Sequence, residues 1–538
     1  MERFASLLGI FVLLGVCYWF STDRKRISWR IVTVGIGFQL YLAAFLVRSD
    51  WVPWLLTIAS TLCLGMLVGE RRFLGGASEE DTSLRAFGVV LARALGQLGF
   101  LTCLIAAWNA SEGGWGLAVL LLALFAYLVP WRLPSIAPLM RRTTTLTGCV
   151  GVVVFIWGGL LPHNFVYRAL DGMSAGVLQV VHYARRGAIY VFAGLGDPSL
   201  ATGWIFAIQV GAIVILFSAL MSLLYYLGVL PWLVKKMAGL LYRGMGVSGA
   251  ESLSAASNVF IGQTEAPLVV RPYLQDMTRS EIMALMAGGF ATIAGSVFGA
   301  YVAFLSNAGF EGAGASLIAA SVMSAPAAFV FAKLLVPETG EPVTSAGAIL
   351  PREQMGTNAL DALAGGVTAG VRLAVNIAAM LLVFYALIDM LNDFVSWLTR
   401  SMPVWLHPYV GDTWSGTLTF QELYSYIFTP FAWFIGVPAG DCVAVGELIG
   451  TKTIFNEFIA YERLAEMIEE GRLAPRSIQL ATYALCGFAN FMSIGIQIGG
   501  LAALAPGRRS DFASLAFKAM IAGMFACQLT ACIVGVIG

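Results

Sequence analysis

The chain has 538 residues, of which 59% are hydrophobic and only 12% are charged, and its mean hydropathy is +0.81. So apolar a chain has too little polar surface to cover a soluble domain, and repeated apolar runs of about 18 or more residues are typical of membrane-spanning helices. A formal net charge of +1 indicates neither a nucleic-acid-binding surface nor an acidic tail.

The first half reads as a series of spans, and the opening one is expected to be retained because it lacks an A-x-A cleavage site. The predicted spans cover residues 3–21, 31–48, 53–69, 86–107, 115–131, 147–162 and 204–230. Loops rich in Lys and Arg alternate with less basic ones. By the positive-inside rule, we expect the N-terminus outside and residues 235–243 in the cytoplasm. Residues 165–202 have mixed polarity at helical spacing and predict an interfacial helix.

The second half has spans at 281–306, 311–336, 366–398, 478–505 and 510–537, alternating with interrupted apolar stretches. Residues 248–262 form only about 22 Å of helix, too short for a hydrocarbon core of about 30 Å. Gly262 then breaks the pattern and Pro267 suits the first turn of a new helix. This predicts a re-entrant hairpin. A second hairpin is predicted where residues 425–437 meet "PAGD" at 438–441 and continue through 442–454.

A weak internal repeat accompanies these interruptions. "GGFATIAGS" at 288–296 resembles "CGFANFMSIG" at 486–495, and Glu265 and Glu457 each precede one copy. Repeated broken helices are typical of secondary transporters, which bind substrate and ion where such helices meet. The alternative is that Gly-Phe-Ala is a common packing tripeptide.

The polar residues of the interruptions are the candidate site. An intramembrane carboxylate is expensive unless solvated or paired, so Glu265 and Glu457 are read as functional, with structural capping as the alternative. Gln263 and Asn490 offer donors and acceptors for a base or sugar, or interhelical hydrogen bonds. Asn258 and Thr292 carry hard oxygen ligands for an ion such as Na⁺, or are ordinary caps.

Other chemistry is not indicated. The eight cysteines are scattered and are read as packing residues, and His163, His182 and His407 are too far apart to predict a zinc site. "GLGD" at 194–197 matches a protease motif, but Pro198 follows directly and no Tyr-Asp pair precedes it. With no HExxH, GxSxG or P-loop either, we expect no enzyme and no cofactor other than a coupling ion.

Several long motifs resemble the concentrative nucleoside transporter family: "GQTEAPLVVRPYL", "GGFATIAGS", "GTKTIFNEFIAY" and "CGFANFMSIGIQIGGLAALAPGRR". The resemblance extends from about residue 165 to 538 and includes the N-terminal stretch "LLGIFVLLGVCYWFSTDRKRISWR". It implies an all-α polytopic membrane protein, a homotrimer in which two re-entrant hairpins and inverted repeats form an elevator-type transport domain on a trimeric scaffold.

The resemblance also implies residue roles. Gln263, Thr264 and Glu265 would contact the nucleobase, with Val297 nearby. Glu457, Asn490 and Ser493 would contact the ribose, with Phe488 lining the pocket. Sodium would lie among the side chains of Asn258 and Thr292 and the backbone carbonyls of Ile261 and Ile293.

This chain departs from compact bacterial members by inserting residues 50–160, which read as four extra spans expected at the scaffold periphery. The expected divisions are N-terminal spans (1–48), inserted spans (49–162), interfacial helix and scaffold span (163–246), first hairpin and broken helix (247–310), scaffold spans and interfacial segment (311–418), second hairpin and broken helices (419–510) and a last span (511–538).

The resulting prediction is a sodium-driven nucleoside symporter of the inner or plasma membrane. Its expected partners are a nucleoside, sodium, the lipid bilayer and two further copies of itself, without nucleic acid. Proton coupling and a nucleoside-binding sensor without transport remain open alternatives. Purine or pyrimidine preference is not readable from the residues.

Overall fold

The computed structural model describes residues 2–46, 165–197, 205–345, 357–400 and 419–537, and every regular element in these ranges is helical. Six helical segments there are long and apolar enough to cross a membrane. They are Glu2–Trp19, Ala207–Tyr226, Arg279–Asn307, Ala313–Leu335, Ala359–Leu398 and Pro506–Ile537. The predicted spans at 53–69, 86–107, 115–131 and 147–162 lie outside the described residues, as does the whole insertion.

The N-terminal elements agree with the sequence pattern. Helix α1 (Glu2–Trp19) and α2 (Trp29–Leu46) flank the short helix η1 (Arg24–Arg26). The segment predicted as an interfacial helix forms α7 (Phe165–Phe192) and the turn η3 (Ala193–Gly196). Many of the described side chains of α7 are exposed, including Tyr190 and Val191, which is compatible with a helix that lies against lipid.

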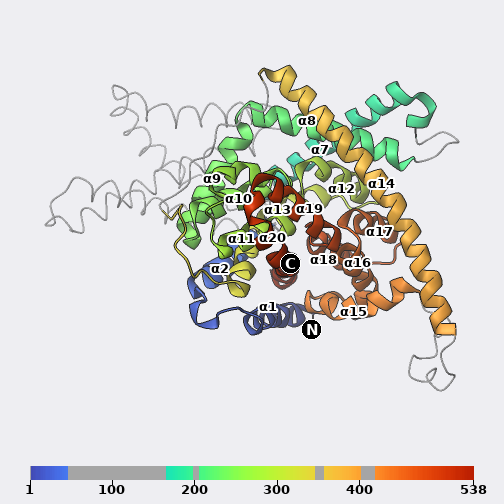
Figure 1. Cartoon of the computed structure of the whole chain (residues 1–538). Coiled ribbons are helices and arrows are strands. Elements are labelled where there is room, and N and C mark those ends of the chain that lie inside the picture. The colour runs from blue at the N-terminus through green and yellow to red at the C-terminus, as the bar shows by residue number, and fades with distance from the viewer. Residues whose placement is uncertain (1, 47–164, 198–204, 346–356, 401–418, 538) are drawn as a thin grey trace, which may run out of the picture. The chain divides into compact units, whose positions relative to one another are not determined.

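The rest of the chain contains two series of helices with the same order (Figure 1). Each has a long helix, a shorter helix, a hairpin, a broken helix and a final long helix. The first series is α8 (Phe206–Tyr226), α9 (Val229–Met245), α10 (Gly249–Asn258), η4 (Ala266–Tyr273), α11 (Arg279–Ala291), α12 (Gly295–Asn307) and α13 (Ala313–Leu335). The second is α14 (Ala359–Arg400), α15 (Phe420–Phe434), α16 (Cys442–Ile454), α17 (Glu457–Glu469), α18 (Pro475–Leu485), α19 (Phe491–Leu504) and α20 (Arg509–Ile537), with the short helices η6 (Ala439–Asp441) and η7 (Pro506–Arg508).

This correspondence corrects the predicted second hairpin. The chain does break between α15 and α16, at residues 435–441, as the "PAGD" sequence suggests. The second acid, however, stands at the next break, between α16 and α17, where Asn456 caps α17 through its side chain. Helices α16 and α17 hold the place in the second series that α10 and η4 hold in the first, and each of the two pairs packs together, so α16 and α17 are the counterpart of the first hairpin. The prediction placed the turn too early because Pro and Gly occur only at the earlier break. "PAGD" contains both residues, whereas "IFNE" at the later break contains neither.

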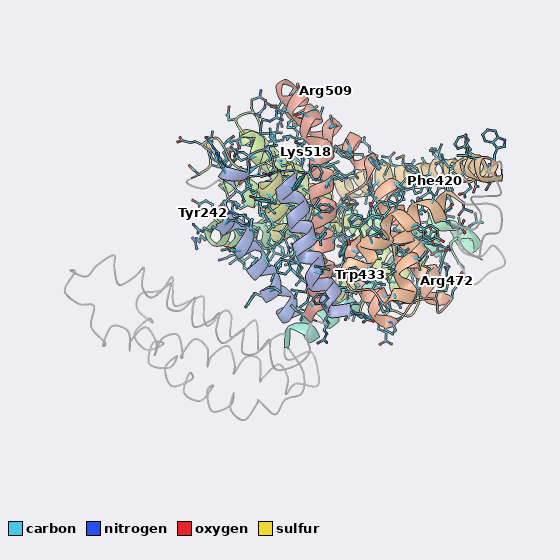
Figure 2. The ribbon with its side chains drawn as sticks, turned by 90° about the horizontal axis from the view of Figure 1, so that it is seen from below. Tyr242, Phe420, Trp433, Arg472, Arg509 and Lys518 are labelled. Carbon is cyan, nitrogen blue, oxygen red and sulfur yellow. The ribbon has the colours of Figure 1, made fainter. Side chains whose placement is uncertain are left out.

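The core is built by the last helix of each series and the broken helices. Helices α11, α13 and α20 pack against one another, and 83–89% of the residues in their most apolar windows are buried. Helix α13 therefore packs with the broken helices, and it belongs to the range 311–418 that was predicted to hold scaffold spans. In contrast, α14 packs mainly on α8 and only 11% of its window is buried. Large apolar side chains remain exposed on α14, including Phe394, and on α15, including Trp433, which Figure 2 labels. Such surfaces indicate contact with lipid or another subunit.

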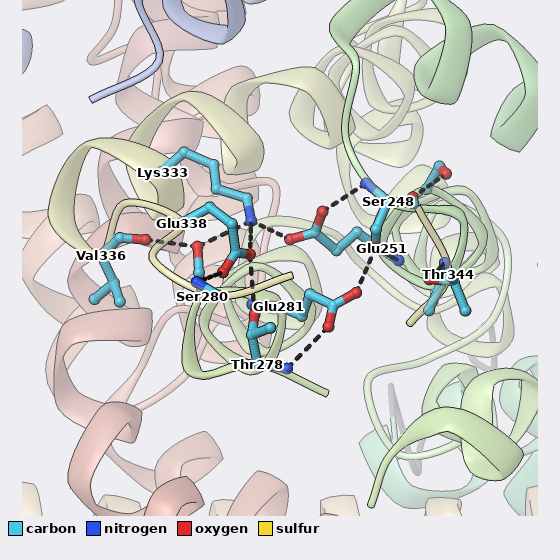
Figure 3. Close-up of polar contacts among 12 residues, drawn as sticks. Ser248, Glu251, Thr278, Ser280, Glu281, Lys333, Val336, Glu338 and Thr344 are labelled. Carbon is cyan, nitrogen blue, oxygen red and sulfur yellow. Dashed lines mark hydrogen bonds and ion pairs between the residues drawn. The ribbon is translucent and has the colours of Figure 1, made fainter. Parts of the chain in front are cut away.

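A buried polar network joins the ends of α10, α11 and α13 (Figure 3). Ser248 and Thr278 each begin a helix with a capping box, in which the hydroxyl and the Glu three residues later satisfy each other's backbone N–H groups. The Ser248 hydroxyl also donates to Glu281 Oε1 at 2.6 Å. Lys333 pairs with Glu251 and, at 3.3 Å, with Glu338. The network therefore anchors the base of the first hairpin.

Candidate functional site

The two copies of the Gly-Phe-Ala motif meet in the structure. A Cβ atom built on Gly487 would lie 2.8 Å from the carbonyl oxygen of Phe290 and 2.9 Å from that of Ala291. Only a glycine allows so close an approach of the two backbones. The α11–α12 break and the α18–α19 break are therefore in contact, and the repeat seen in the sequence lies at the centre of the fold.

The tip of the first hairpin presents polar groups between α10 and η4. Gln263 is half-buried, whereas Thr264 and Glu265 are exposed. The backbone N–H groups of Glu265 and Ala266 both bond to the carbonyl of Gly262, at 3.0 and 2.9 Å, which closes the turn. Gly262 and Pro267 thus act as the sequence indicated, and the side chains of the tip are left available to a ligand.

Glu457 is the first residue of α17 and only 6% of its surface is exposed. Its Oε2 atom accepts a hydrogen bond of 3.0 Å from Nδ2 of Asn490, and its Oε1 accepts one of 2.9 Å from the hydroxyl of Tyr301. A buried carboxylate needs such donors, because an unpaired charge in this environment would be expelled or neutralised. No basic side chain of the described residues lies within ion-pair distance of Glu457.

A chain of hydrogen bonds links the two halves of the predicted site. Asn490 caps α19, its Oδ1 accepting from the backbone N–H of Ser493 at 2.8 Å. The Ser493 hydroxyl in turn accepts from Nε2 of Gln263 at 3.1 Å. Gln263 and Ser493 are separated by 230 positions in sequence. Folding therefore brings together Gln263, Glu457, Asn490 and Ser493 in one continuous cluster, from both series of helices.

The remaining predicted substrate residues lie on neighbouring segments. Val297 is buried in the first turn of α12, and Phe488 is half-buried in the α18–α19 break, two positions before Asn490. Thr264 and Glu265 are exposed beside the cluster at the hairpin tip.

Two polar residues of this cluster escaped the sequence reading. Tyr301 on α12 contacts Glu457, and Gln497 on α19 donates from Nε2 to Gln263 Oε1 at 3.0 Å and to the carbonyl of Met286 at 3.1 Å. Gly289 makes room for the Gln497 amide, since a Cβ there would lie 2.6 Å from Nε2. A signal existed for Gln497, which is a lone amide in the apolar run "IGIQIGG". Tyr301 gave none, because tyrosine is common in apolar helices.

The predicted ion ligands lie where the first hairpin touches the α11–α12 break. Asn258 and Thr292 are 1% and 2% exposed, and Oδ1 of Asn258 is buried without a hydrogen-bond donor among the described residues. The N–H of Gly295 donates to the carbonyl of Phe260 at 3.1 Å and so joins the break to the hairpin. A buried amide oxygen that accepts no hydrogen bond is available as a ligand for a cation.

Ile261 and Ile293 lie in the two non-helical stretches that meet at this point. Outside regular helix, a carbonyl has no partner four residues ahead and is free to coordinate an ion. Thr292 donates its hydroxyl proton to the carbonyl of Gly288 at 3.0 Å, so the lone pairs of the hydroxyl oxygen remain available to coordinate an ion. Among the described residues no group of three His, Cys, Asp or Glu side chains could hold a metal. These neutral oxygens therefore suit a singly charged ion better than a divalent one.

Three family profiles match the chain. "Na+ dependent nucleoside transporter N-terminus" covers residues 8–67, "Nucleoside recognition" covers 207–308, and "Na+ dependent nucleoside transporter C-terminus" covers 316–535. The cluster described above falls within the second and third.

Similar proteins are found among curated sequences. An uncharacterized transporter of Haemophilus influenzae is 44% identical over 399 residues, which are 73% of this chain and 90% of that protein. Mouse solute carrier family 28 member 3 is 43% identical over 69% of this chain and 52% of its own length. Rat sodium/nucleoside cotransporter 1 is 42% identical over 69% of this chain and 57% of its own length. The chain thus spans just over half the length of these mammalian relatives.

Solved structures show the same fold. CNTnw in an inward-facing, substrate-bound state is 30% identical, with a TM-score of 0.69 and coverage of 100% of this chain and 98% of that one. A CNTnw variant in an intermediate state gives 31% identity and a TM-score of 0.70, covering 100% and 99%. The expected all-α polytopic membrane fold is confirmed.

Proposed function

The chain belongs to the family of Na⁺-dependent, or concentrative, nucleoside transporters, and on that premise we propose that it is a symporter that imports nucleosides across the plasma membrane. The observation that carries this proposal is the hydrogen-bonded cluster that joins the first hairpin to α17 and α19. Amides and hydroxyls from both repeats and the carboxylate of Glu457 converge there, and these groups suit a substrate with many donors and acceptors.

The two ends of the substrate are assigned to different repeats. Gln263, Thr264 and Glu265 would bind the nucleobase, with Val297 and Phe488 beside it, because the hairpin tip presents accessible polar groups with both donors and acceptors. Glu457, Asn490 and Ser493 would bind the ribose. A buried carboxylate that can still accept hydrogen bonds is a strong acceptor for sugar hydroxyls. Substrate bound in this way would bridge the two repeats.

Sodium is proposed as the coupling ion, at the site formed by Asn258, Thr292 and the carbonyls of Ile261 and Ile293. The unpartnered Asn258 Oδ1 supports this assignment. Ile261, a proposed ion ligand, precedes Thr264 by only three residues on the hairpin. An ion bound there would therefore order the tip that binds the base. Substrate affinity would then depend on sodium, and by linkage sodium affinity would depend on substrate.

Transport by an elevator movement in a homotrimer is proposed by similarity to CNTnw, for which inward-facing and intermediate states are known. The exposed pair α8 and α14 would form the scaffold that contacts lipid and neighbouring subunits. The hairpins and broken helices would move with the substrate. The inserted residues 49–162 are proposed to enlarge the scaffold periphery.

The N-terminus is proposed to face outward. Lys235, Lys236 and Arg243 are exposed on α9, as expected for a cytoplasmic face. Arg30, in the first basic loop, lies at the same end, since its guanidinium carbon would be 3.4 Å from a Cβ built on Gly246. Two regions that the charge rule assigns to the cytoplasm are therefore neighbours in space.

The experiment is uptake of labelled uridine and adenosine into proteoliposomes, with and without an inward sodium gradient. Accumulation that requires the gradient is expected. Equal uptake driven by a pH gradient in sodium-free buffer would favour proton coupling instead, and binding without counterflow would favour a sensor. Glu265→Gln and Glu457→Gln should each strongly weaken uptake while the protein still assembles. Wild-type uptake by both variants would refute the site assignment.

A further inference from the structure

Tyr301, from the first series of helices, hydrogen-bonds the buried acid of the second. It lies on α12, is 0% exposed, and donates its phenolic proton to Oε1 of Glu457 at 2.9 Å. The two residues are 156 positions apart. No family resemblance assigned it a role, and it does not belong to the predicted site.

The phenol is held rigidly. Its ring stacks on Tyr461 with ring centres 4.6 Å apart and meets Phe458 edge to face at 5.4 Å. Both neighbours lie on α17, the helix that Glu457 begins. Aromatic contacts of this kind fix ring orientation. The hydroxyl therefore cannot swing away from the carboxylate without disrupting the packing of α12 on α17.

The consequence concerns the orientation of the carboxylate. Tyr301 holds one oxygen and Asn490 holds the other, which fixes the plane of the group. Each carboxylate oxygen can accept more than one hydrogen bond, so the pair of oxygens can still accept from a ligand. Two adjacent hydroxyls on one ring match such a pair, in the way that paired donors match a carboxylate bidentately.

We propose that Tyr301 is a positioning residue that orients Glu457 toward the vicinal 2′ and 3′ hydroxyls of a ribonucleoside, and thereby sets the preference for ribose over dideoxyribose. The inference rests on the proposed function. Tyr301 acts through Glu457 and does not itself contact substrate. Its contribution disappears for a sugar that lacks both hydroxyls.

Tyr461 provides a matched control. It is also 0% exposed and belongs to the same aromatic stack, but its hydroxyl donates to the carbonyl of Thr482 at 2.9 Å. Tyr461→Phe therefore removes an equally buried hydroxyl from the same cluster without touching Glu457. A general packing effect would appear in both variants, whereas a positioning effect would appear only in Tyr301→Phe.

The experiment measures equilibrium binding of uridine and 2′,3′-dideoxyuridine to the purified full-length protein in sodium buffer. The quantity compared between variants is the affinity for uridine divided by the affinity for 2′,3′-dideoxyuridine. We expect Tyr301→Phe to reduce this ratio about tenfold, the usual effect of losing one hydrogen bond to a charged group. Tyr461→Phe should leave the ratio within about twofold of the wild-type value. An unchanged ratio in Tyr301→Phe would overturn the inference, as would equal losses in the two variants.

A double variant tests whether Tyr301 acts through Glu457 or by another route. In Glu457→Gln, the carboxylate that Tyr301 orients is gone, so adding Tyr301→Phe should change the uridine to dideoxyuridine ratio no further. A further fall would show that Tyr301 acts by another route. The proposed function fails separately, if the wild-type protein binds neither uridine nor adenosine; wild-type discrimination that survives Tyr301→Phe refutes the positioning role alone.

Discussion

Replacing Lys333 with Met tests whether the buried network at the base of the first hairpin stabilises the fold. The side chain of Lys333 is 5% exposed and that of its partner Glu251 is 1% exposed. Glu338, at 3.3 Å from the Lys333 ammonium, is 26% exposed. Two carboxylates, those of Glu251 and Glu338, pair with the ammonium, and Glu281 is joined to the same network through Ser248. Removing the cation leaves Glu251 buried and unpaired.

The expected magnitude follows from this burial. Breaking a buried ion pair by removing one partner typically costs about 3–5 kcal/mol, most of it from the charge left behind. Glu338 can reach water and should add little. The matched surface pair is Arg472 and Glu470, at 3.3 Å, whose side chains are 44% and 52% exposed. Arg472→Met should therefore lower the free energy of unfolding by only about 0–1 kcal/mol.

The assay is unfolding of the purified protein in mixed micelles by increasing denaturing detergent, with tryptophan fluorescence as the signal. The double variant Lys333→Met/Glu251→Gln should recover part of the loss, because it removes the unpaired charge while the Gln oxygen can still accept from the N–H of Ser248. Equal losses in Lys333→Met and Arg472→Met would refute the reasoning, and so would a double variant less stable than Lys333→Met.

Three further outcomes are expected. Asn258→Ala should raise several-fold the sodium concentration that half-activates uptake and change uptake at saturating sodium less, whereas an unchanged sodium dependence would remove Asn258 from the ion site. Gly295→Ala places a Cβ 2.5 Å from the carbonyl oxygen of Phe260 and should lower the free energy of unfolding by about 1–3 kcal/mol. The control is Gly239→Ala on α9, where nothing lies within 4 Å of the added Cβ, and this variant should not lower the free energy of unfolding. Lys452 is 1% exposed, and its ammonium donates to the carbonyl of Ala484 at 2.9 Å. Lys452→Met removes this hydrogen bond and should weaken both stability and uptake. Wild-type thermal stability of the variant would contradict that expectation.

The hairpin that carries the candidate site could be predicted because its signals are local. Gly262, Pro267 and Glu265 are unusual within an apolar stretch, and each acts through its own backbone or immediate neighbours. The repeated Gly-Phe-Ala motif likewise located both broken helices. The second hairpin was misplaced, because "FNE" at 455–457 breaks a helix without Gly or Pro, and Asn456 does so through a side-chain cap.

The partners of these groups could not be predicted. Tyr301 meets Glu457 across 156 positions, and Gln497 meets Gln263 across 234. Local polarity and periodicity carry no information about which of many apolar faces will pack together. By itself, the sequence indicated that the chain enters the membrane, where several of its helices break and which acids lie near those breaks, since burial of unpaired backbone and charge is penalised residue by residue. Only the tertiary structure decided which donors hold Glu457, because that depends on how two series of helices pack against each other.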